Sequence, residues 1–436
     1  MTDLEASDRS QAPYPVSTLP RLQAVVQLPG SRSITNRALV CAALAPPSSF
    51  LRGITESDDV NAMAEGLSAL GIRIGKKGTR WEVEGQSGTF SASDVTLDVG
   101  ASGTTARFLT AASCLAAGNI FLTGTRRMKE RPIFGLTKAL KSLGAELRVI
   151  GENGCPPVQI IGSGLSGGRT SVETHLSSQF LSGLLLSAPC ANSDVELIFS
   201  SKTIVSKPFL ELTYQVMEDF GAEFSITQNG VTVRARGYKP TDYTIEPDAQ
   251  SAVYAFCAAA IAGGTIKVLG IPQNSNQTDL RILEILERMG CSVQRENSSV
   301  LVQGATGKLK GIEVDMNGIP DAVLALAVVA LFAEGPTTIK NIANLKIKES
   351  NRLQALKNEI CRLGAKAEIG EDFIQIEPKP LHSAEVQTYE DHRMAMSFAL
   401  AGLKIPGIKI CNPSCVNKTW PEYFSFLEKL ETETQS

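Results

Sequence analysis

The most constraining feature of this chain is a pattern that recurs five times. A helix-forming segment ends in glycine and is followed by two short segments of alternating polarity, separated by a turn. Glycine suits the left-handed conformation at the end of a helix, and alternation of apolar and polar residues is typical of half-buried strands. The marker glycines are Gly71, Gly144, Gly221, Gly290 and Gly364, at spacings of 73, 77, 69 and 74 residues. These spacings exceed those of solenoid repeats and predict units of two helices and several strands.

A sixth unit is predicted to be split between the two ends of the sequence. A helix-forming segment at 421–430 has no glycine and strands after it, and a strand predicted at 22–28 would supply a missing strand from the other end. Six units predict two domains of three units each. We therefore expect a flexible tail at 1–18, a first domain at 31–243, and a second domain formed by 19–30 and 244–436.

The bulk composition excludes several classes of protein. The chain has 42 basic and 45 acidic residues, so no basic excess points to a nucleic-acid partner. No run of about 18 apolar residues predicts a membrane span, and no signal for export or import is recognised in the N-terminal segment. The nine cysteines are scattered singly, which favours a reducing cytoplasm. The three histidines form no set with metal-ligand spacing, and no cofactor motif is found, so we expect neither a metal nor a cofactor. We expect a monomer.

Basic residues recur at predicted helix starts, where acidic residues are usually favoured. A helix N-terminus carries a partial positive charge, so a cation there is unfavourable unless an anion lies among the cations. Each residue alone is more simply read as a solvated surface cation, but their recurrence at equivalent ends predicts a site for small polyanions. The residues are Arg32, Arg37, Arg107, Arg131, Lys207, Lys348, Arg352, Arg393 and Lys418.

Eight motifs in the sequence resemble those of the 5-enolpyruvylshikimate-3-phosphate (EPSP) synthase family, over about residues 22–430. The resemblance implies an α/β protein with the enolpyruvyl transferase fold. This is a two-domain inside-out α/β barrel with three βαββαβ units per domain, helices inside, sheets outside and a ligand cleft between the domains. The motifs are LPGSRSITNRAL, GASGTTARFL, RMKERPI, SSQFLSGLLLSAP, IPDAVLALAVVALFAEG, NIANLKIKESNRL, DHRMAM and NKTWPEYF.

The resemblance also implies an activity and binding residues. The family transfers a carboxyvinyl (enolpyruvyl) group from phosphoenolpyruvate to the 5-hydroxyl of shikimate 3-phosphate and releases phosphate, a step toward chorismate and the aromatic amino acids. The implied residues for shikimate 3-phosphate are Arg32, Ser33, Arg37, Ser177, Ser178, Gln179, Ser206, Asp321, Asn344 and Lys348. Those implied for phosphoenolpyruvate are Arg32, Gly103, Arg131, Arg352, Arg393 and Lys418, whereas Arg107 is expected only to pin a loop.

Two carboxylates match the acid-base residues of the family. By resemblance, Asp321 would orient and deprotonate the acceptor hydroxyl with help from Lys348 and Asn344, and Glu349 would exchange a proton with the methylene carbon. Each has a simpler alternative. Asp321 precedes an apolar helical segment and would serve as its N-cap, and Glu349 would be a solvated acid in a first helical turn.

The chain departs from the family pattern at three positions. Arg32 replaces a lysine, Ala101 an asparagine and Phe209 a tyrosine. Because of these changes, an alternative function remains, namely that of a related enolpyruvyl transferase that acts on another phosphorylated acceptor. A transferase acting on a nucleotide-sugar would need a reactive cysteine, and Cys114, the nearest candidate, is predicted to be buried. An inactive module that binds polyanions is a further alternative, which the two carboxylates disfavour.

Overall fold

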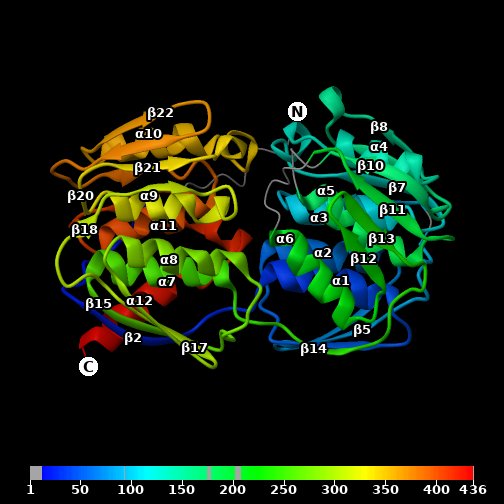
Figure 1. The fold of residues 1–436 in the computed structure, drawn as a ribbon, viewed down its shortest axis with the longest axis horizontal. Helices are drawn as coiled ribbons and strands as arrows, with labels where there is room; N and C mark the ends of the chain where they lie inside the picture. Colours follow the sequence, from blue (N-terminus) through cyan, green and yellow to red (C-terminus); the bar gives the residue numbers. More distant parts are fainter. Residues whose placement is uncertain (1–11, 93, 174–177, 202–207, 436) are drawn as a thin grey trace. The chain divides into compact units, whose positions relative to one another are not determined.

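The structure, a computed structural model, describes residues 12–92, 94–173, 178–201 and 208–435, which fall into two compact units (Figure 1). The N-terminal unit comprises residues 29–248 and 276–278, and the C-terminal unit comprises the described residues up to 28, 249–275 and those from 279 onward. The chain therefore crosses between the units at 28/29 and 248/249. The boundaries predicted from the sequence were 30/31 and 243/244. Each unit is described by itself below.

One order of strands recurs in the sheets of the N-terminal unit. In the sheet β6-β7-β9-β8, the first two strands are parallel and the next two pairs are antiparallel. The sheets β14-β3-β5-β4 and β10-β11-β13-β12 have the same arrangement. The strands are β3 (Ser49–Arg52), β4 (Arg73–Lys77), β5 (Arg80–Glu84), β6 (Val95–Asp98), β7 (Gly118–Thr123), β8 (Glu146–Val149), β9 (Val158–Gly162), β10 (Gly168–Val172), β11 (Val195–Phe199), β12 (Phe224–Thr227), β13 (Gly230–Val233) and β14 (Asp242–Thr244).

The C-terminal unit repeats this order in β16-β17-β15-β2 and β19-β21-β23-β22, and in the shorter sheet β1-β25-β24. A two-stranded sheet, β18-β20, is added to them. The strands are β1 (Tyr14–Pro15), β2 (Leu22–Gln27), β15 (Gly264–Leu269), β16 (Ser292–Glu296), β17 (Ser299–Gln303), β18 (Leu309–Lys310), β19 (Glu313–Asp315), β20 (Ala333–Glu334), β21 (Thr337–Lys340), β22 (Lys366–Ile369), β23 (Ile374–Glu377), β24 (Glu385–Val386) and β25 (Lys409–Ile410).

The sheet at the end of the chain is completed by a strand that the sequence placed in a flexible tail. β1 pairs antiparallel with β25, whereas β2 joins the sheet that contains the hairpin after Gly290, parallel to β15. The aromatic ring of Tyr14 packs on Phe424 with 4.2 Å between ring centroids, and its hydroxyl donates to Glu428 at 2.8 Å. These contacts explain why the expected tail at 1–18 is too long, because apolar burial and pairing hold residues from 14 onward.

Three helices in each unit are buried along almost their whole length. A helix that is apolar on all sides must be covered on all sides, and Figure 1 shows this for the C-terminal unit, where helices lie between the sheet containing β2 and β15 and the sheet containing β21 and β22. The buried helices are α1 (Arg32–Leu44), α3 (Gly103–Ser113), α5 (Ser178–Ser187), α7 (Ala249–Ala262), α9 (Val323–Ala330) and α11 (His392–Gly402). Helices inside and sheets outside confirm the predicted fold class.

The other helices are amphipathic, each with an apolar face toward the core. They are α2 (Asp58–Ala69), α4 (Phe134–Ser142), α6 (Pro208–Asp219), α8 (Ile282–Arg288), α10 (Arg352–Arg362) and α12 (Tyr423–Gln435). Short 3-10 helices connect the elements: η1 (Met128–Glu130), η2 (Glu152–Gly154), η3 (Ala188–Cys190), η4 (Thr278–Arg281), η5 (Pro320–Ala322), η6 (Ala343–Ile347) and η7 (Pro413–Lys418). Across the described ranges, no helix has the length and apolar character that crossing a bilayer requires.

The five marker glycines all have the left-handed conformation that the repeat predicts. Their φ angles are 98° at Gly71, 91° at Gly144, 77° at Gly221, 109° at Gly290 and 100° at Gly364. Each follows one of the amphipathic helices and precedes the first strand of a hairpin. The glycine therefore ends the helix and reverses the chain onto the sheet that covers it.

Replacement of a marker glycine should destabilise the fold more than replacement of a glycine with open space around it. A Cβ at Gly144 would lie 2.3 Å from the Ser166 hydroxyl oxygen, whereas Gly164, with the same φ of 91°, has nothing within 4 Å. Gly164→Ala should cost about 1–2 kcal/mol of backbone strain, and Gly144→Ala should cost more. Scanning calorimetry of both variants checks this, and equal melting temperatures would show that the close contact at Gly144 has no energetic effect.

Candidate functional site

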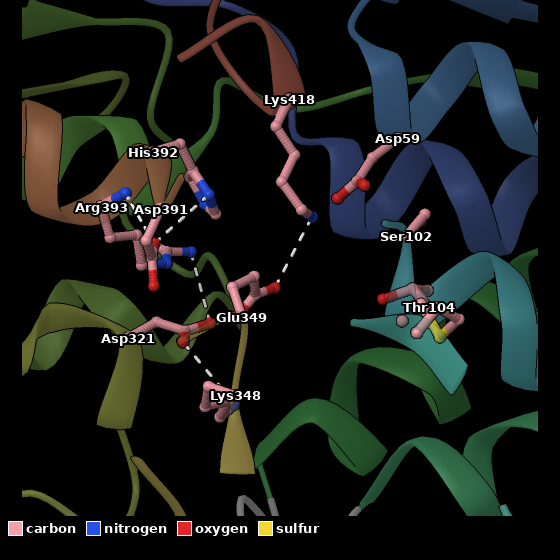
Figure 2. A network of polar contacts seen from close by, with 12 residues as sticks. Asp59, Ser102, Thr104, Asp321, Lys348, Glu349, Asp391, His392, Arg393 and Lys418 are labelled. Atoms are coloured by element: carbon pink, nitrogen blue, oxygen red, sulfur yellow. Dashed lines mark hydrogen bonds and ion pairs between the residues drawn. The ribbon is translucent and has the colours of Figure 1, made fainter. Parts of the chain in front are cut away.

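In the C-terminal unit, residues at or just before the starts of five helices meet in one cluster of ion pairs and hydrogen bonds (Figure 2). The side chains that contact one another come from α7, from η5 (which precedes α9), from the segment that leads into α10, from the start of α11, and from η7 (which precedes α12). Because each of these ends carries a partial positive charge, the cluster lies where negative charge is favoured. The members are Gln250, Asp321, Lys348, Glu349, Arg352, Asp391, Arg393 and Lys418.

Arg352 is the central cation of this cluster. Only 1% of its side chain is exposed, and its three nitrogens face three carboxylates. Nε lies 2.8 Å from Asp391, Nη1 lies 2.9 Å from Asp321, and Nη2 lies 2.9 Å from Glu349. Burial alone would lower the pKa of Arg352, but the three carboxylates raise it well above its ordinary value. The planar guanidinium thus fixes the positions of three acids at once.

Asp321 faces three cations and makes no side-chain cap. Besides Arg352, it lies 3.3 Å from Arg393 and 3.6 Å from Lys348. Burial would raise the pKa of Asp321, but the charges of Arg393, Lys348 and Arg352 outweigh this effect and hold it well below the ordinary value. Neither η5 nor α9 has a side-chain hydrogen bond at its N-cap, so the N-cap alternative for Asp321 is wrong.

Glu349 is also held by cations. It bonds Arg352 and lies 3.6 Å from Lys418, and 16% of its side chain is exposed. The solvated-acid alternative for Glu349 is therefore wrong. Nearby in the sequence, Asn344 belongs to η6, and its amide oxygen is buried with no hydrogen-bond partner among the residues that the structure describes. An acceptor in that condition is suited to a ligand hydroxyl.

Arg393, near the start of α11, is held against α7. It donates to the Gln250 amide oxygen at 2.6 Å and to the Tyr254 hydroxyl at 3.2 Å. Burial would lower the pKa of Arg393, but Asp321 and Tyr254 raise it above its ordinary value. Its guanidinium is therefore a permanent cation, and like that of Arg352 it pairs with Asp321.

In the N-terminal unit, Arg37 is a buried cation surrounded by neutral groups. It donates to the hydroxyl oxygens of Thr213 and Ser182 and to the carbonyls of Ser33 and Phe209, at 2.8–3.5 Å. Within the described part of the chain, no carboxylate pairs with it. Burial lowers the pKa of Arg37 to about 10. A buried guanidinium with only neutral partners is unfavourable alone, and a ligand carboxylate would compensate it.

Arg32 contacts an acid that the sequence interpretation did not include. It begins α1 and lies 2.6 Å from Asp59 in the first turn of α2, and both side chains are largely buried. The backbone carbonyl of Asp59 accepts a hydrogen bond from the Thr105 hydroxyl at 3.3 Å. The arginine that departs from the family pattern is therefore linked to the first turn of α3.

The guanidinium of Arg131 lies close to the backbone of Gly103 at the start of α3. Ser102 caps the helix by accepting from the backbone N–H of Thr105. A Cβ at Gly103 would lie 2.5 Å from a guanidinium nitrogen of Arg131, so a larger residue would force that guanidinium to shift. Arg107 donates to the carbonyl of Pro132 at 2.6 Å, which confirms that it pins the loop before α4.

The start of α5 lies against α3. Ser178 is buried, and the Gln179 amide donates to the Thr104 hydroxyl at 3.3 Å (Thr104 is labelled in Figure 2). The predicted residues Ser177, Ser206 and Lys207 lie outside the described residues.

Sequence reasoning missed three members of these networks: Asp59, Gln250 and Asp391. Asp391 is buried, and its carboxylate caps α11 by accepting from the Arg393 N–H at 3.0 Å. An acid just before a buried helix that begins with His-Arg was the available signal. Asp59 looked like an ordinary acid of a first helical turn, and Gln250 carried no signal.

The chemistry available to the described residues is anion binding and proton transfer. No group of three His, Cys, Asp or Glu side chains among them is arranged to hold a metal ion. Cys114 is buried, and burial raises the pKa of its thiol to about 12. It would therefore be an unreactive thiol at neutral pH, which disfavours the cysteine-dependent alternative.

Comparisons with known proteins agree with this chemistry. The chain is 42% identical to 3-phosphoshikimate 1-carboxyvinyltransferases from Vibrio campbellii, over 94% of this chain and 97% of the relative, and from Actinobacillus pleuropneumoniae, over 96% and 99%. An EPSP synthase structure from Acinetobacter baumannii has a TM-score of 0.80 at 25% identity and covers 96% of this chain and 98% of its own. The enolpyruvyl transferase NikO from Streptomyces tendae, at 19% identity, has a TM-score of 0.78 over 96% and 98% and shares the fold. A family model matches residues 16–427, and the chain therefore belongs to the EPSP synthase (3-phosphoshikimate 1-carboxyvinyltransferase) family.

Proposed function

We propose that this chain transfers the enolpyruvyl group of phosphoenolpyruvate to the 5-hydroxyl of shikimate 3-phosphate and releases phosphate. Family membership supports the reaction and its place in aromatic biosynthesis. The observation that carries the proposal is the cluster around Arg352, in which two carboxylates and several cations meet at helix starts. Such a cluster offers both anion binding and two groups that exchange protons.

The reaction is an addition followed by an elimination. Glu349 gives a proton to the methylene carbon of phosphoenolpyruvate, the 5-hydroxyl oxygen bonds to C2, and Asp321 accepts the hydroxyl proton. A proton then returns from the new methyl group to Glu349, the bond between C2 and the phosphate oxygen breaks, and phosphate leaves with the proton that Asp321 had accepted. The two carboxylates thus have separate tasks, as in other acid-base pairs.

The low pKa of Asp321 makes it a weak base until anions bind. Arg352 and Arg393 supply much of the charge that lowers this pKa. Both guanidiniums suit bidentate binding of a carboxylate or phosphate, so phosphoenolpyruvate would share them with Asp321. That sharing would weaken their effect on Asp321 and raise its basicity when both substrates are present.

The other residues of the site would bind or orient the two substrates. Arg37 would bind the carboxylate of shikimate 3-phosphate, Gln179 would lie against its ring, and Ser33, Ser177, Ser178 and Ser206 would supply the other polar contacts. Arg131, Lys418 and the backbone of Gly103 would bind phosphoenolpyruvate with Arg352 and Arg393. Arg32 would contact both substrates, and Asn344 and Lys348 would orient the acceptor.

The acceptor distinguishes this proposal from the sibling-transferase alternative. The relatives named above, at 42% identity, carry the shikimate name, whereas NikO supports only the fold. A phosphate-release assay with shikimate 3-phosphate and phosphoenolpyruvate tests the proposal. Release of phosphate that depends on both substrates is expected, and its absence would exclude the proposed acceptor or the activity itself.

The cytoplasm and a monomeric state are part of the same proposal. All nine cysteines lie among the described residues and are free, which suits a reducing compartment. Sedimentation of the purified chain would test the monomer.

Conservative replacement of either carboxylate should lower turnover more than it weakens substrate binding. We expect Asp321→Asn and Glu349→Gln each to reduce kcat by about a hundredfold or more, the scale of a general acid-base group. As a contrast, Arg37→Ala should chiefly raise the KM for shikimate 3-phosphate, because it removes a binding cation. Steady-state kinetics of the three variants measures both quantities, and near-normal kcat in the carboxylate variants would contradict the mechanism.

Asp321 should also stabilise the fold, in a manner that depends on pH. Its folded pKa lies below the unfolded value of about 3.9, so its contribution is full above that pH and is lost as pH falls through the folded pKa. Asp321→Asn should lower the unfolding free energy at pH 7 by on the order of 3 kcal/mol, because it breaks a buried ion pair.

Thermal unfolding from pH 8 to 3 measures this contribution. The difference between wild type and Asp321→Asn should be constant at neutral pH and should narrow below about pH 4, around the unfolded pKa of aspartate. Asp242→Asn, which breaks an exposed ion pair with Arg52, is the matched control and should have little effect. A difference that widened toward acid pH would contradict the assigned direction of the shift.

The departures at Arg32 and Ala101 should set the response to glyphosate, an anionic mimic of phosphoenolpyruvate. Arg32 is tied to Asp59, which contacts Thr105 in the helix that follows Ala101, so the two positions are coupled through α3. Arg32→Lys with Ala101→Asn should tighten glyphosate inhibition, and Arg32→Lys alone should give a smaller gain or none. Inhibition constants of the parent, both single variants and the double variant decide this; an unchanged constant in the double variant would rule it out.

A further inference from the structure

The segment before α11 contains a tight turn made from unsuitable residues. The backbone N–H of Asp391 donates to the carbonyl of Thr388 at 2.9 Å. The two residues between them, Tyr389 and Glu390, have φ angles of 55° and 56°. Turns with φ above zero at both central positions normally use Gly, Asn or Asp. A tyrosine and a glutamate there carry backbone strain and need support from their surroundings.

That support comes from Glu359, in the third turn of α10. Its side chain is fully buried. One carboxylate oxygen accepts from the backbone N–H of Gln387 at 3.0 Å and from Arg362 at 2.9 Å. The other accepts from the Tyr389 hydroxyl at 2.8 Å. Glu359 therefore holds the turn both at its entry and at its first strained residue.

The far end of the turn leads directly into the candidate site. Asp391 bonds Arg352, accepts from the Ser350 hydroxyl at 3.0 Å, and caps the helix that carries Arg393. Figure 2 shows Asp391 beside Arg393 and His392. Arg352 and Glu359 are seven residues apart on α10, about two helical turns, and therefore share a face. Helix α10 thus holds the segment 387–391 at both of its ends, through Glu359 at the first and Arg352 at the last.

We propose that Glu359 is a positioning residue for the transfer reaction. It holds residues 387–390 in the strained turn, so that Asp391 orients Arg352 and sets the start of α11 with Arg393. It touches no substrate and acts through the turn. The inference rests on the proposed function, because the effect is measured on that reaction.

Glu359→Gln is the direct test, because it keeps the size of the side chain. The amide oxygen can still accept from Gln387 and Arg362, but the amide nitrogen cannot accept from the Tyr389 hydroxyl, so the turn loses its charged acceptor at the first strained residue. We expect kcat to fall by about tenfold to a hundredfold, the scale of small misplacements in a site, with a raised KM for phosphoenolpyruvate. The Kd for shikimate 3-phosphate, measured by calorimetry, should change less, because most of the residues implied for that substrate are in the other unit.

Glu390→Asn separates positioning from stability. Asparagine adopts positive φ more readily than glutamate, so it should let the turn hold its shape with less help from Glu359. In wild type this change should leave kcat unaltered. In the Glu359→Gln background it should restore much of the lost kcat, which a merely structural role for Glu359 does not predict.

Tyr423→Phe is the matched control for lost stability. It removes a buried hydroxyl that donates to the Met396 carbonyl of α11 at 2.6 Å, and leaves the turn untouched. It should lower the melting temperature without lowering kcat. If Glu359→Gln does not fold, Tyr389→Phe replaces it, since it changes no residue of α10 and removes the hydroxyl that donates to Glu359 and accepts from Asn358 at 3.2 Å. Its kcat should fall, whereas a comparable loss of melting temperature in Tyr423→Phe should not lower kcat.

Wild-type kinetic constants in Glu359→Gln, or a loss that Glu390→Asn fails to restore, would overturn the proposal. So would an unaltered kcat in Tyr389→Phe if that variant has to be used. The proposed function fails separately, because in that case wild type itself would release no phosphate from the two substrates.

Discussion

One guanidinium excluded from water, with a carboxylate at each of its three nitrogens, determines how the C-terminal unit is arranged at its helix starts. A charge so deeply buried is costly unless it is paired, and Arg352 draws its partners from η5, from the segment before α10 and from the cap of α11. The same requirement orders the acids that the proposed reaction would use. Under that proposal, stability and catalysis share one set of contacts, and a substrate anion would compete with resident carboxylates for the cations.

The buried Arg37 of the N-terminal unit has no carboxylate partner among the described residues. Arg37 is as buried as Arg352, but its partners are hydroxyls and carbonyls. The two arginines differ in what a ligand would do to them. An arriving carboxylate adds the first full counter-charge to Arg37, whereas at Arg352 it redistributes a charge that is already compensated. This difference is consistent with the proposed roles, in which Arg37 only binds substrate and the cluster around Arg352 also contains the acid-base carboxylates.

Much of the fold follows from local signals in the sequence. The marker glycines, the alternation after them and the apolar helices all have physical causes that act within a few residues, so the unit and its sixfold recurrence were predictable. Pairing between distant strands was not. The place of Tyr14 in the last sheet depends on Phe424 and Glu428, and nothing near Tyr14 announces those partners. Likewise, basic residues at helix starts indicated the site, but the acids that compensate them did not stand out, because Asp59 looked like an ordinary acid of a first helical turn and Asp391 like an ordinary cap.

The strand β1 also affects the order in which the chain can be assembled. The N-terminal unit is almost continuous in sequence, so it can bury its core as soon as residue 248 has left the ribosome. The C-terminal unit needs β1 and β2 from the beginning of the chain and β25 and α12 from its end. During synthesis, Leu22 and its neighbours must wait, unpaired, for partners made more than two hundred residues later. Two of the three exposed side chains of β2, Gln23 and Gln27, are polar and limit the apolar surface that the unpaired strand exposes.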